Sequence, residues 1–233
     1  MSPVENKVVS LDCDDFSNVG GGGRIVVVMV QHMGCVIRGI SMRIISGYAR
    51  GRTIKAPAEG TRPTSDRAKE GLFSSLGVRF GFDGARVLDL FAGSGALGLE
   101  AISRGAESVV FVDTDAGAID TIRENIRRVG NVNADVVRRP VSSYLAGAPQ
   151  DYFDIVFIDP PYALIDDAVH DILVGLAPHV RDGAAVVVER SSASAETAWP
   201  HGYEPTGQKL KKRTYGAARM DMASYTRPVE DEH

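Results

Sequence analysis

The stretch 86-RVLDLFAGSGALGLE-100 decides the fold of this chain. Its first half is largely apolar, as is typical of a buried strand, and its second half has the composition of a helix. Gly93, Gly95 and Gly98 between and within them have the spacing G-x-G-x-x-G. Glycines in this pattern let the backbone turn sharply from strand to helix and approach a ligand closely. The stretch therefore predicts a strand–turn–helix unit of an α/β protein, with a ligand at the turn.

Strand-like and helix-like segments alternate on both sides of this unit. The predicted strands cover residues 86–91, 108–113, 134–138, 154–159 and 184–190, and the predicted helices cover 95–104, 115–129, 141–146 and 166–178. Nearly apolar strands separated by helices indicate a mostly parallel sheet that is covered on both faces. Two strand-like segments at 203–210 and 218–225, around 211-KKRTYG-216, predict a closing antiparallel hairpin.

The segment that precedes the alternation is basic. Residues 43–56 predict a short strand or hairpin, and residues 61–77 predict a helix capped by Thr64 or Ser65. Across residues 42–80, eight Lys or Arg stand against three acids, although the net charge of the chain is −4. A local basic patch on an acidic protein indicates one face that binds phosphates.

Length and composition limit the remaining classes. A chain of 233 residues with 44% hydrophobic content is long enough for one sizeable core. No apolar run approaches the roughly 20 residues that a membrane-spanning helix needs. Both cysteines, Cys13 and Cys35, precede residue 42, which excludes a disulfide framework from the main domain and favours a cytoplasmic protein.

These patterns predict four parts along the chain. Residues 1–41 have no helical or strand period, so we expect a disordered or non-native extension there. A basic hairpin and helix would follow at 42–82, then the main domain at 83–228, and a tail at 229–233.

An acid follows the glycine loop at an informative distance. Asp113 lies twenty residues after Gly93, at the end of the second strand, where a carboxylate can accept both hydroxyls of a ribose. The two together indicate a nucleoside site, with three interpretations: a nicotinamide or flavin cofactor, S-adenosylmethionine, or a tight turn without a ligand. Asp89 before the loop favours S-adenosylmethionine, because its carboxylate suits the ammonium group of methionine and would repel a pyrophosphate.

The strand at 154–159 runs into Asp159, Pro160, Pro161 and Tyr162. The prolines prevent further strand pairing and hold the acid at the carboxyl end of the strand. The exocyclic amine of a nucleobase is a poor nucleophile, so it must be held in line while its protons are accepted. The carboxylate and the Pro160 carbonyl offer two acceptors, and Tyr162 offers a face for base stacking. The motif therefore predicts metal-free methyl transfer to a nucleobase amine.

Four segments carry a family resemblance: 42-MRIISGYARGR-52, 61-TRPTSDR-67, 89-DLFAGSGALGLEAISRGA-106 and 159-DPPY-162. Together they closely resemble the bacterial family that methylates a guanine N2 in 16S ribosomal RNA, over essentially all of residues 42–226. The resemblance implies a class I S-adenosylmethionine-dependent methyltransferase with a Rossmann-like sheet and a small N-terminal hairpin and helix extension. The expected enzyme is a monomer that acts on the small ribosomal subunit or an assembly intermediate.

The resemblance also implies roles for individual residues. The cofactor would be bound by Asp89, Phe91, Ala92, Gly93, Ser94 and Gly95 at its methionine part, by Asp113 at its ribose, and by Arg62, Pro63 and Thr64 on its reactive side. The guanine would be held by Asp159, Pro160, Pro161 and Tyr162. We expect RNA phosphates to be bound by Arg43, Arg50, Arg52, Lys55, Arg67, Lys211, Lys212 and Arg213. One departure is Pro140, which stands where the family commonly has an acid near the adenine, so we assign no side chain to the adenine.

Other functions fit part of the sequence. An adenine-N6 methyltransferase on DNA or RNA would use Asp159 to Tyr162 equally well, but no part of the chain remains to form a DNA recognition domain. Protein-glutamine methylation goes with Asn at the position of Asp159, and a dehydrogenase would leave the proline motif without a role. A non-catalytic RNA-binding assembly factor would not need the intact motif.

Overall fold

The computed structural model describes residues 42–56, 66–161 and 163–228. A central sheet in the order β5-β4-β3-β6-β7-β10-β8 dominates these residues, and β9 pairs with β10. Its parallel strands are β3 (Arg86–Leu90), β4 (Ser108–Asp113), β5 (Ala134–Arg138), β6 (Phe153–Ile158) and β7 (Val180–Ser191). The antiparallel strands are β8 (Tyr203–Pro205), β9 (Thr214–Tyr215) and β10 (Ala218–Tyr225). The mostly parallel Rossmann-like sheet predicted from the sequence is thus confirmed.

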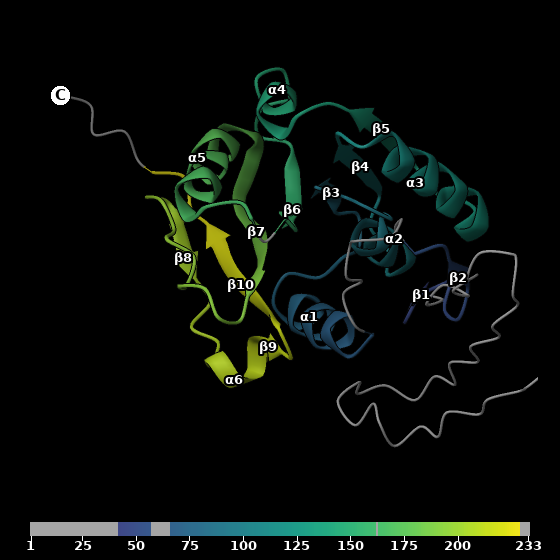
Figure 1. Ribbon diagram of the computed structural model, residues 1–233, viewed down its shortest axis with the longest axis horizontal. Coiled ribbons are helices and arrows are strands. Elements are labelled where there is room, and N and C mark those ends of the chain that lie inside the picture. Colours follow the sequence, from purple (N-terminus) through teal and green to yellow (C-terminus); the bar gives the residue numbers. More distant parts are fainter. Residues whose placement is uncertain (1–41, 57–65, 162, 229–233) are drawn as a thin grey trace, which may run out of the picture. The chain divides into compact units, whose positions relative to one another are not determined.

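Helices cover both faces of this sheet (Figure 1). On one face lie α1 (Asp66–Arg79), α2 (Ala96–Ser103) and α3 (Ala116–Val129). On the other lie α4 (Val141–Leu145) and α5 (Asp166–Leu176), followed by the 3-10 turn η2 (Ala177–His179). None of the helices in the described ranges is both long and apolar enough to cross a membrane.

Two hydrophobic clusters separated by the sheet form the core. Successive strand residues point to opposite faces, so Val87, Phe157 and Val187 pack with α1 to α3, whereas Ile158 and Val188 pack with α4 and α5. The three apolar residues of α1 near the sheet, Leu72, Phe73 and Leu76, are fully buried. Because both faces are covered, the strands must be apolar on both sides, which is why they could be located in the sequence.

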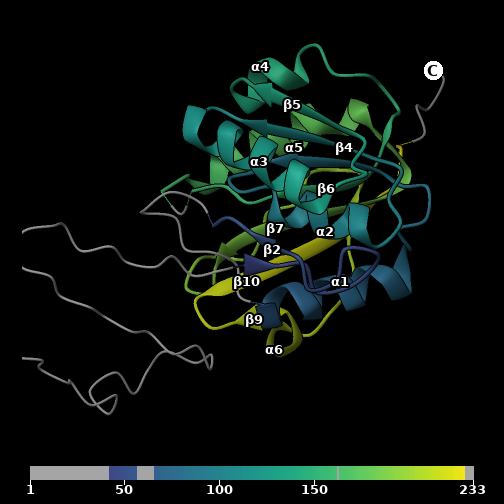
Figure 2. The same ribbon diagram turned by 90° about the vertical axis from the view of Figure 1, so that its right-hand side faces the viewer.

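The carboxyl-terminal part differs from the predicted hairpin. The strand expected at 203–210 ends at Pro205, and residues 210–213 form the short helix α6 (Leu210–Arg213) instead. Gly207 between them has a φ of 64°, a left-handed conformation that interrupts a strand. Strand β10 pairs with β7 over seven residues and with β8 over only three. Its main partner is therefore β7, the last parallel strand, and not the preceding strand of the predicted hairpin. Figure 2 shows α6 and β9 beside α1.

The basic amino-terminal hairpin, β1 (Met42–Arg43) with β2 (Thr53–Ile54), docks on α2. The Glu100 carboxylate accepts hydrogen bonds from the backbone N–H groups of Ile45 (2.7 Å) and Ser46 (3.0 Å) and from Arg104 Nε (2.8 Å). Gly47 has a φ of 83°, and a Cβ there would lie 1.6 Å from the carbonyl oxygen of Ser103. The helix that follows the glycine loop therefore also positions the basic segment.

Replacing Glu100 with Ala should lower the free energy of unfolding by about 3 kcal/mol, because two backbone N–H groups and a guanidinium lose their acceptor. Urea titration followed by circular dichroism measures the loss. Glu107→Ala, at an exposed position just after the same helix, serves as control and should change stability by no more than about 0.5 kcal/mol. Equal effects of the two substitutions would contradict the docking role of Glu100.

Candidate active site

The candidate site lies where the strand order reverses. The chain passes outward from β3 to β4 and β5, then returns to the other side of β3 for β6 and β7. In open α/β sheets, ligands bind at such a switch point, outside the carboxyl ends of the strands. Here those ends carry the glycine loop after β3 and the Asp159 segment after β6, as the sequence predicts.

The glycine loop contains three residues in the left-handed conformation. Phe91 has a φ of 59°, Gly93 of 55° and Gly95 of 75°. Glycine adopts this conformation freely, but an aromatic residue does so at a cost and is found there mainly at functional sites. At Gly98, a Cβ would lie 2.5 Å from the Phe111 ring and 2.7 Å from a Val109 methyl, so only glycine allows α2 to pack on β4 this closely.

Asp89, near the end of β3, stabilises this loop through a hydrogen bond to α2. Its carboxylate is buried and accepts a hydrogen bond from the backbone N–H of Gly98 at 2.9 Å. Burial raises the pKa of Asp89 to about 8, and the nearby charge of Asp113 adds to the rise, while the bond from Gly98 lowers it. The site thus holds an acid that ionises near neutral pH, where a cationic ligand favours its charged form.

Asp113 reaches back to the same loop. One carboxylate oxygen accepts the N–H of Gly93 at 2.9 Å, and the other accepts the N–H of Asp115 at 2.9 Å. Each oxygen retains a second lone pair, and the side chain is partly exposed. The carboxylate is therefore fixed in place at the loop and can still accept hydroxyl groups.

Asn125 of α3 is a residue that the sequence interpretation missed. Its buried side chain donates to the carbonyl oxygens of Ser94 (2.9 Å) and Lys55 (3.0 Å) and accepts from the N–H of Lys55 (2.7 Å). The hydroxyl of Ser94 contacts the sulfur of Met42, so this side chain faces the hairpin. Asn125 thereby joins the glycine loop to the end of the basic hairpin. The sequence signal that could have revealed Asn125 is its position as a polar residue on the otherwise apolar face of a predicted helix.

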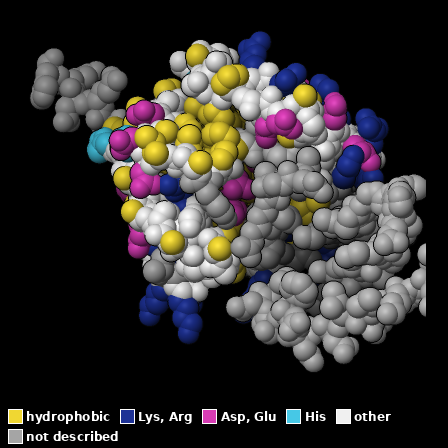
Figure 3. Space-filling view, in the orientation of Figure 1, with side chains coloured by type: hydrophobic (Ala, Val, Ile, Leu, Met, Phe, Trp, Pro, Cys, Tyr) yellow, Lys and Arg dark blue, Asp and Glu magenta, His cyan; other side chains and the backbone are white. Residues whose placement is uncertain are grey.

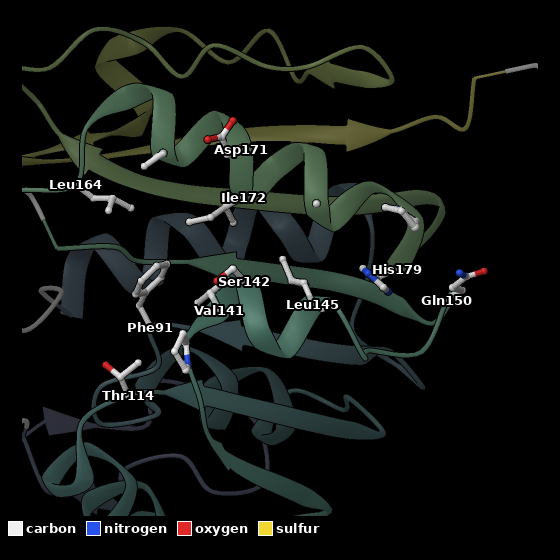
Figure 4. A pocket seen from close by; sticks show the side chains of 15 residues that line it. Phe91, Thr114, Val141, Ser142, Leu145, Gln150, Leu164, Asp171, Ile172 and His179 are labelled. Atoms are coloured by element: carbon white, nitrogen blue, oxygen red, sulfur yellow. The ribbon is translucent and has the colours of Figure 1, made fainter.

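A cavity of about 730 Å³ opens beside the loop, between α4 and α5. Figure 4 shows Phe91 and Thr114 at one end of it and Gln150 and His179 at the other. Pro140 and Val141 also line it, so the segment that lacks the expected acid provides an apolar wall. In the space-filling view, hydrophobic side chains gather at this place (Figure 3). The end near Phe91 suits a planar, mostly apolar group such as adenine.

Asp159 stands at the carboxyl end of β6. Its N–H donates to the carbonyl oxygen of Leu90 at 3.3 Å, which continues the pairing with β3. Pro160 is buried and Pro161 is exposed. Burial, followed by the charges of Glu189 and Asp89, raises the pKa of Asp159 well above its ordinary range.

The loop that follows Asp159 is held by Arg190 of β7. The guanidinium donates to the carbonyl oxygen of Leu164 at 3.4 Å and forms an ion pair with Asp166, the first residue of α5. Only 7% of the Arg190 side chain is exposed. The sequence analysis assigned no role to Arg190, whereas the structure shows that its guanidinium supports this loop.

Several predicted site residues lie outside the described residues, namely Arg62, Pro63, Thr64 and Tyr162. Of the basic residues predicted to bind RNA, Arg213 is half-buried and the others are exposed. Some of them also bind within the protein: Arg52 donates to the carbonyl oxygen of Val129, Lys55 pairs with Glu124 at 3.1 Å, and Arg213 pairs with Asp221 and Glu196. Arg43 has a further interaction within the protein as well.

Comparison with known proteins places this geometry in a family. The family described as "Conserved hypothetical protein 95" matches residues 42–224. The chain belongs to this family. Its relatives include a Bacillus subtilis protein named "Putative rRNA methyltransferase YlbH", 46% identical over 52% of this chain and 67% of that protein. Another, "Ribosomal RNA small subunit methyltransferase D" of Escherichia coli, is 40% identical over 55% of this chain and 65%, just under two thirds, of that protein.

A solved structure shows the same fold. The structure titled "Putative methyltransferase yhhF from Escherichia coli" matches 81% of this chain and 99% of its own, at 29% identity and a TM-score of 0.66. The methyltransferase fold and the family expected from the sequence are confirmed.

Family and fold together identify S-adenosylmethionine as the cofactor, and the residues present fit it. The Asp113 carboxylate lies at the left-handed loop with free acceptor capacity for ribose hydroxyls, and the cavity beside Phe91 can take an adenine. Burial raises the pKa of Asp89 to about 8, so this carboxyl could ionise beside a bound cation. None of the described residues forms a cluster of metal ligands.

The buried acid predicts a pH dependence of stability. Because the pKa of Asp89 is raised from 3.8 to about 8, the folded protein retains a proton that the unfolded chain releases, so stability falls as pH rises from about 4 to 8. Asp89→Asn keeps an acceptor for Gly98 and removes the charge, so at pH 8 it should be more stable than the wild type by on the order of 2 kcal/mol. Urea titrations at pH 5 and pH 8 test this.

The gain from Asp89→Asn should shrink toward pH 5. Asp120→Asn, at an exposed position of α3, is the control and should leave the pH profile unchanged. A gain of the same size at both pH values would show that the Asp89 carboxyl is not the titrating group.

Proposed function

We propose that this protein transfers a methyl group from S-adenosylmethionine to the exocyclic N2 amine of a guanine in 16S ribosomal RNA of the small subunit. The observation that carries the proposal is the position of Asp159. Its backbone N–H binds the end of β3, so Asp159 lies at the switch point, at the same edge of the sheet as the glycine loop. Relatives named as ribosomal RNA methyltransferases, one of them of the small subunit, support the RNA class. The guanine N2 assignment rests on the resemblance of four motifs in the sequence.

Asp159 and its neighbours do the positional part of the chemistry. Bound S-adenosylmethionine supplies an electrophilic methyl group on a sulfonium. The carboxylate of Asp159 and the carbonyl oxygen of Pro160 accept the amine protons and hold the nitrogen in line with that methyl group. The bond to the carboxylate strengthens as the amine becomes acidic, which favours the transition state over the bound substrate.

The substrate has to present its base away from a helix stack. A guanine edge reaches a carboxylate at the end of a buried strand only when the base is in a loop or is flipped out. The exposed cations lie on the basic hairpin, on α1 and at α6, and Figure 3 shows Lys and Arg side chains projecting at α6. They would bind the phosphates on either side of the flipped base.

Methylation of adenine N6 is the competing assignment, since the proline motif serves either amine. Nucleoside analysis separates the two. Labelled S-adenosylmethionine and the protein are incubated with small ribosomal subunits from cells that lack this gene, and the RNA is digested. We expect N2-methylguanosine at one site, whereas N6-methyladenosine would overturn the base assignment.

Two variants belong in the same assay. Asp159→Ala should lose most of the turnover, by roughly a hundredfold or more, because the amine loses its acceptor, while cofactor affinity changes little. Asp120→Ala should keep full activity. A large loss of cofactor binding in Asp159→Ala would contradict the role given to this carboxylate.

Binding of RNA should depend on salt through Lys211 and Lys212. Replacing both with Gln should weaken binding and reduce the slope of log K against log salt by about 1–2, since each phosphate contact contributes nearly one unit. Fluorescence anisotropy with a labelled RNA fragment at several salt concentrations measures the slope. Arg181→Gln, at the opposite end of β7, is the matched control. An unchanged slope in the double variant would exclude α6 from the RNA interface.

A further inference from the structure

The turn of the basic hairpin carries an exposed aromatic ring. Tyr48 is 49% exposed, whereas every other aromatic residue in the described ranges 42–56, 66–161 and 163–228 is buried or half-buried. Burial of apolar area is the usual contribution of an aromatic side chain, and about half of this one is left in water. The function proposed above gives this ring no role, although it belongs to a segment that would bind RNA.

The protein holds Tyr48 in place. Its hydroxyl donates a hydrogen bond to the carbonyl oxygen of Gly130, at the end of α3, at 2.7 Å. Its backbone N–H donates to the carbonyl oxygen of Ser103, the last residue of α2, at 2.9 Å. Its neighbours are fixed as well, because a Cβ at Gly47 would overlap the backbone of Ser103, and Ala49 is fully buried. The ring therefore loses little conformational freedom when a ligand binds it.

Two arginines follow Tyr48 in the same turn. The Arg52 guanidinium lies over the Tyr48 ring, 6.0 Å from its centroid, and donates to the carbonyl oxygen of Val129. Arg50 is exposed. An aromatic face among basic side chains is how proteins bind single-stranded nucleic acid, since the ring stacks on a base while the cations bind phosphates.

We propose that Tyr48 is a stacking platform for an unpaired base of the RNA substrate, a base other than the guanine that is methylated. This inference rests on the proposed function. The exposed part of the ring offers a base a flat apolar surface, and the neighbouring guanidinium groups neutralise the phosphates that come with it. Stacking is tolerant of sequence because every base has an aromatic face, so Tyr48 adds affinity without reading the base.

The hairpin sets the distance between this ring and the reacting base. Met42, at its start, contacts Ser94 of the glycine loop, whereas its turn is bonded to the ends of α2 and α3. These helices end near the amino ends of the strands, since β4 and β5 begin within five residues of them. Asp159 follows the carboxyl end of β6, a strand of 6 residues, and such a strand spans roughly 20 Å. The base on Tyr48 is therefore not an immediate neighbour of the target guanine.

The alternative is that Tyr48 serves only to attach the hairpin to α3. That role belongs to the hydroxyl, whereas stacking belongs to the ring, so two substitutions separate them. Tyr48→Phe removes the hydroxyl and keeps the ring, and Tyr48→Leu removes both. The urea midpoints of the two variants should lie below that of the wild type by similar amounts, because each loses the bond to Gly130.

The test measures binding of the labelled protein to small ribosomal subunits from cells that lack this gene, at several salt concentrations. Tyr48→Leu should weaken binding roughly tenfold, within the range typical of one base stacked on an aromatic ring, and Tyr48→Phe by no more than about twofold. In methyl transfer, Tyr48→Leu should raise KM for the subunits by the same factor and leave kcat and KM for the cofactor unchanged, because the ring touches no reacting group.

Two controls accompany these variants. Arg50→Gln should reduce the slope of log K against log salt by about one, since it removes a phosphate contact, whereas Tyr48→Leu should leave the slope unchanged, since stacking releases no counterions. Val174→Ala, at an exposed apolar position of α5, should bind the subunits as the wild type does.

The outcomes separate the two proposals. Equal affinities of Tyr48→Leu and Tyr48→Phe, or a smaller salt slope in Tyr48→Leu, overturn the stacking role and leave the proposed function intact if the wild type forms methylguanosine. A wild type that binds the subunits but methylates no guanine overturns the proposed function, and the difference between the two variants then decides the stacking role by itself. A wild type that does not bind the subunits overturns both.

Discussion

The bond from the Gly98 backbone N–H to the Asp89 carboxylate is the constraint on which the site depends. It ties the end of the central strand to the first turn of α2, so the five residues between them must turn within a short span. That turn requires left-handed conformations at Gly93 and Gly95, and even at Phe91. The backbone N–H of Gly93 is then directed at the Asp113 carboxylate on the neighbouring strand. The buried Asp89 thus fixes the glycine loop, and the loop in turn fixes Asp113. These are the two features that would bind a nucleoside cofactor.

The same edge of the sheet concentrates negative charge. Asp89 on β3 and Glu189 on β7 are buried, and Asp159 at the end of β6 between them is half-buried, so ionisation of a carboxyl group in this region is costly. Raised pKa values lower that cost by keeping protons on the site until a cation arrives. A sulfonium cofactor and a base amine that sheds a proton are both suited to such a site. In the proposed function, these acids serve binding and chemistry at the expense of stability.

Much of this architecture could be predicted from the sequence. The parallel strands were located closely because both faces of the sheet are covered and their residues are apolar throughout. The strand predicted at 203–210 is confirmed only as far as Pro205 and is wrong beyond it, because Pro205 and the left-handed Gly207 interrupt the strand. Local pattern carries no information on partners distant in sequence. It therefore could not show that Glu100 binds the hairpin, or that Asn125 joins that hairpin to the glycine loop.

The central claim is that the carboxyl edge receives the cofactor at the glycine loop and the guanine amine at Asp159. A crystal structure with S-adenosylhomocysteine and a guanosine-containing RNA fragment tests it most directly. The account predicts ribose hydroxyls on Asp113, the adenine beside Phe91 and Pro140, and the guanine N2 within hydrogen-bonding distance of Asp159. A base that enters with N2 turned away from Asp159, or a cofactor bound elsewhere than over the glycine loop, would contradict it.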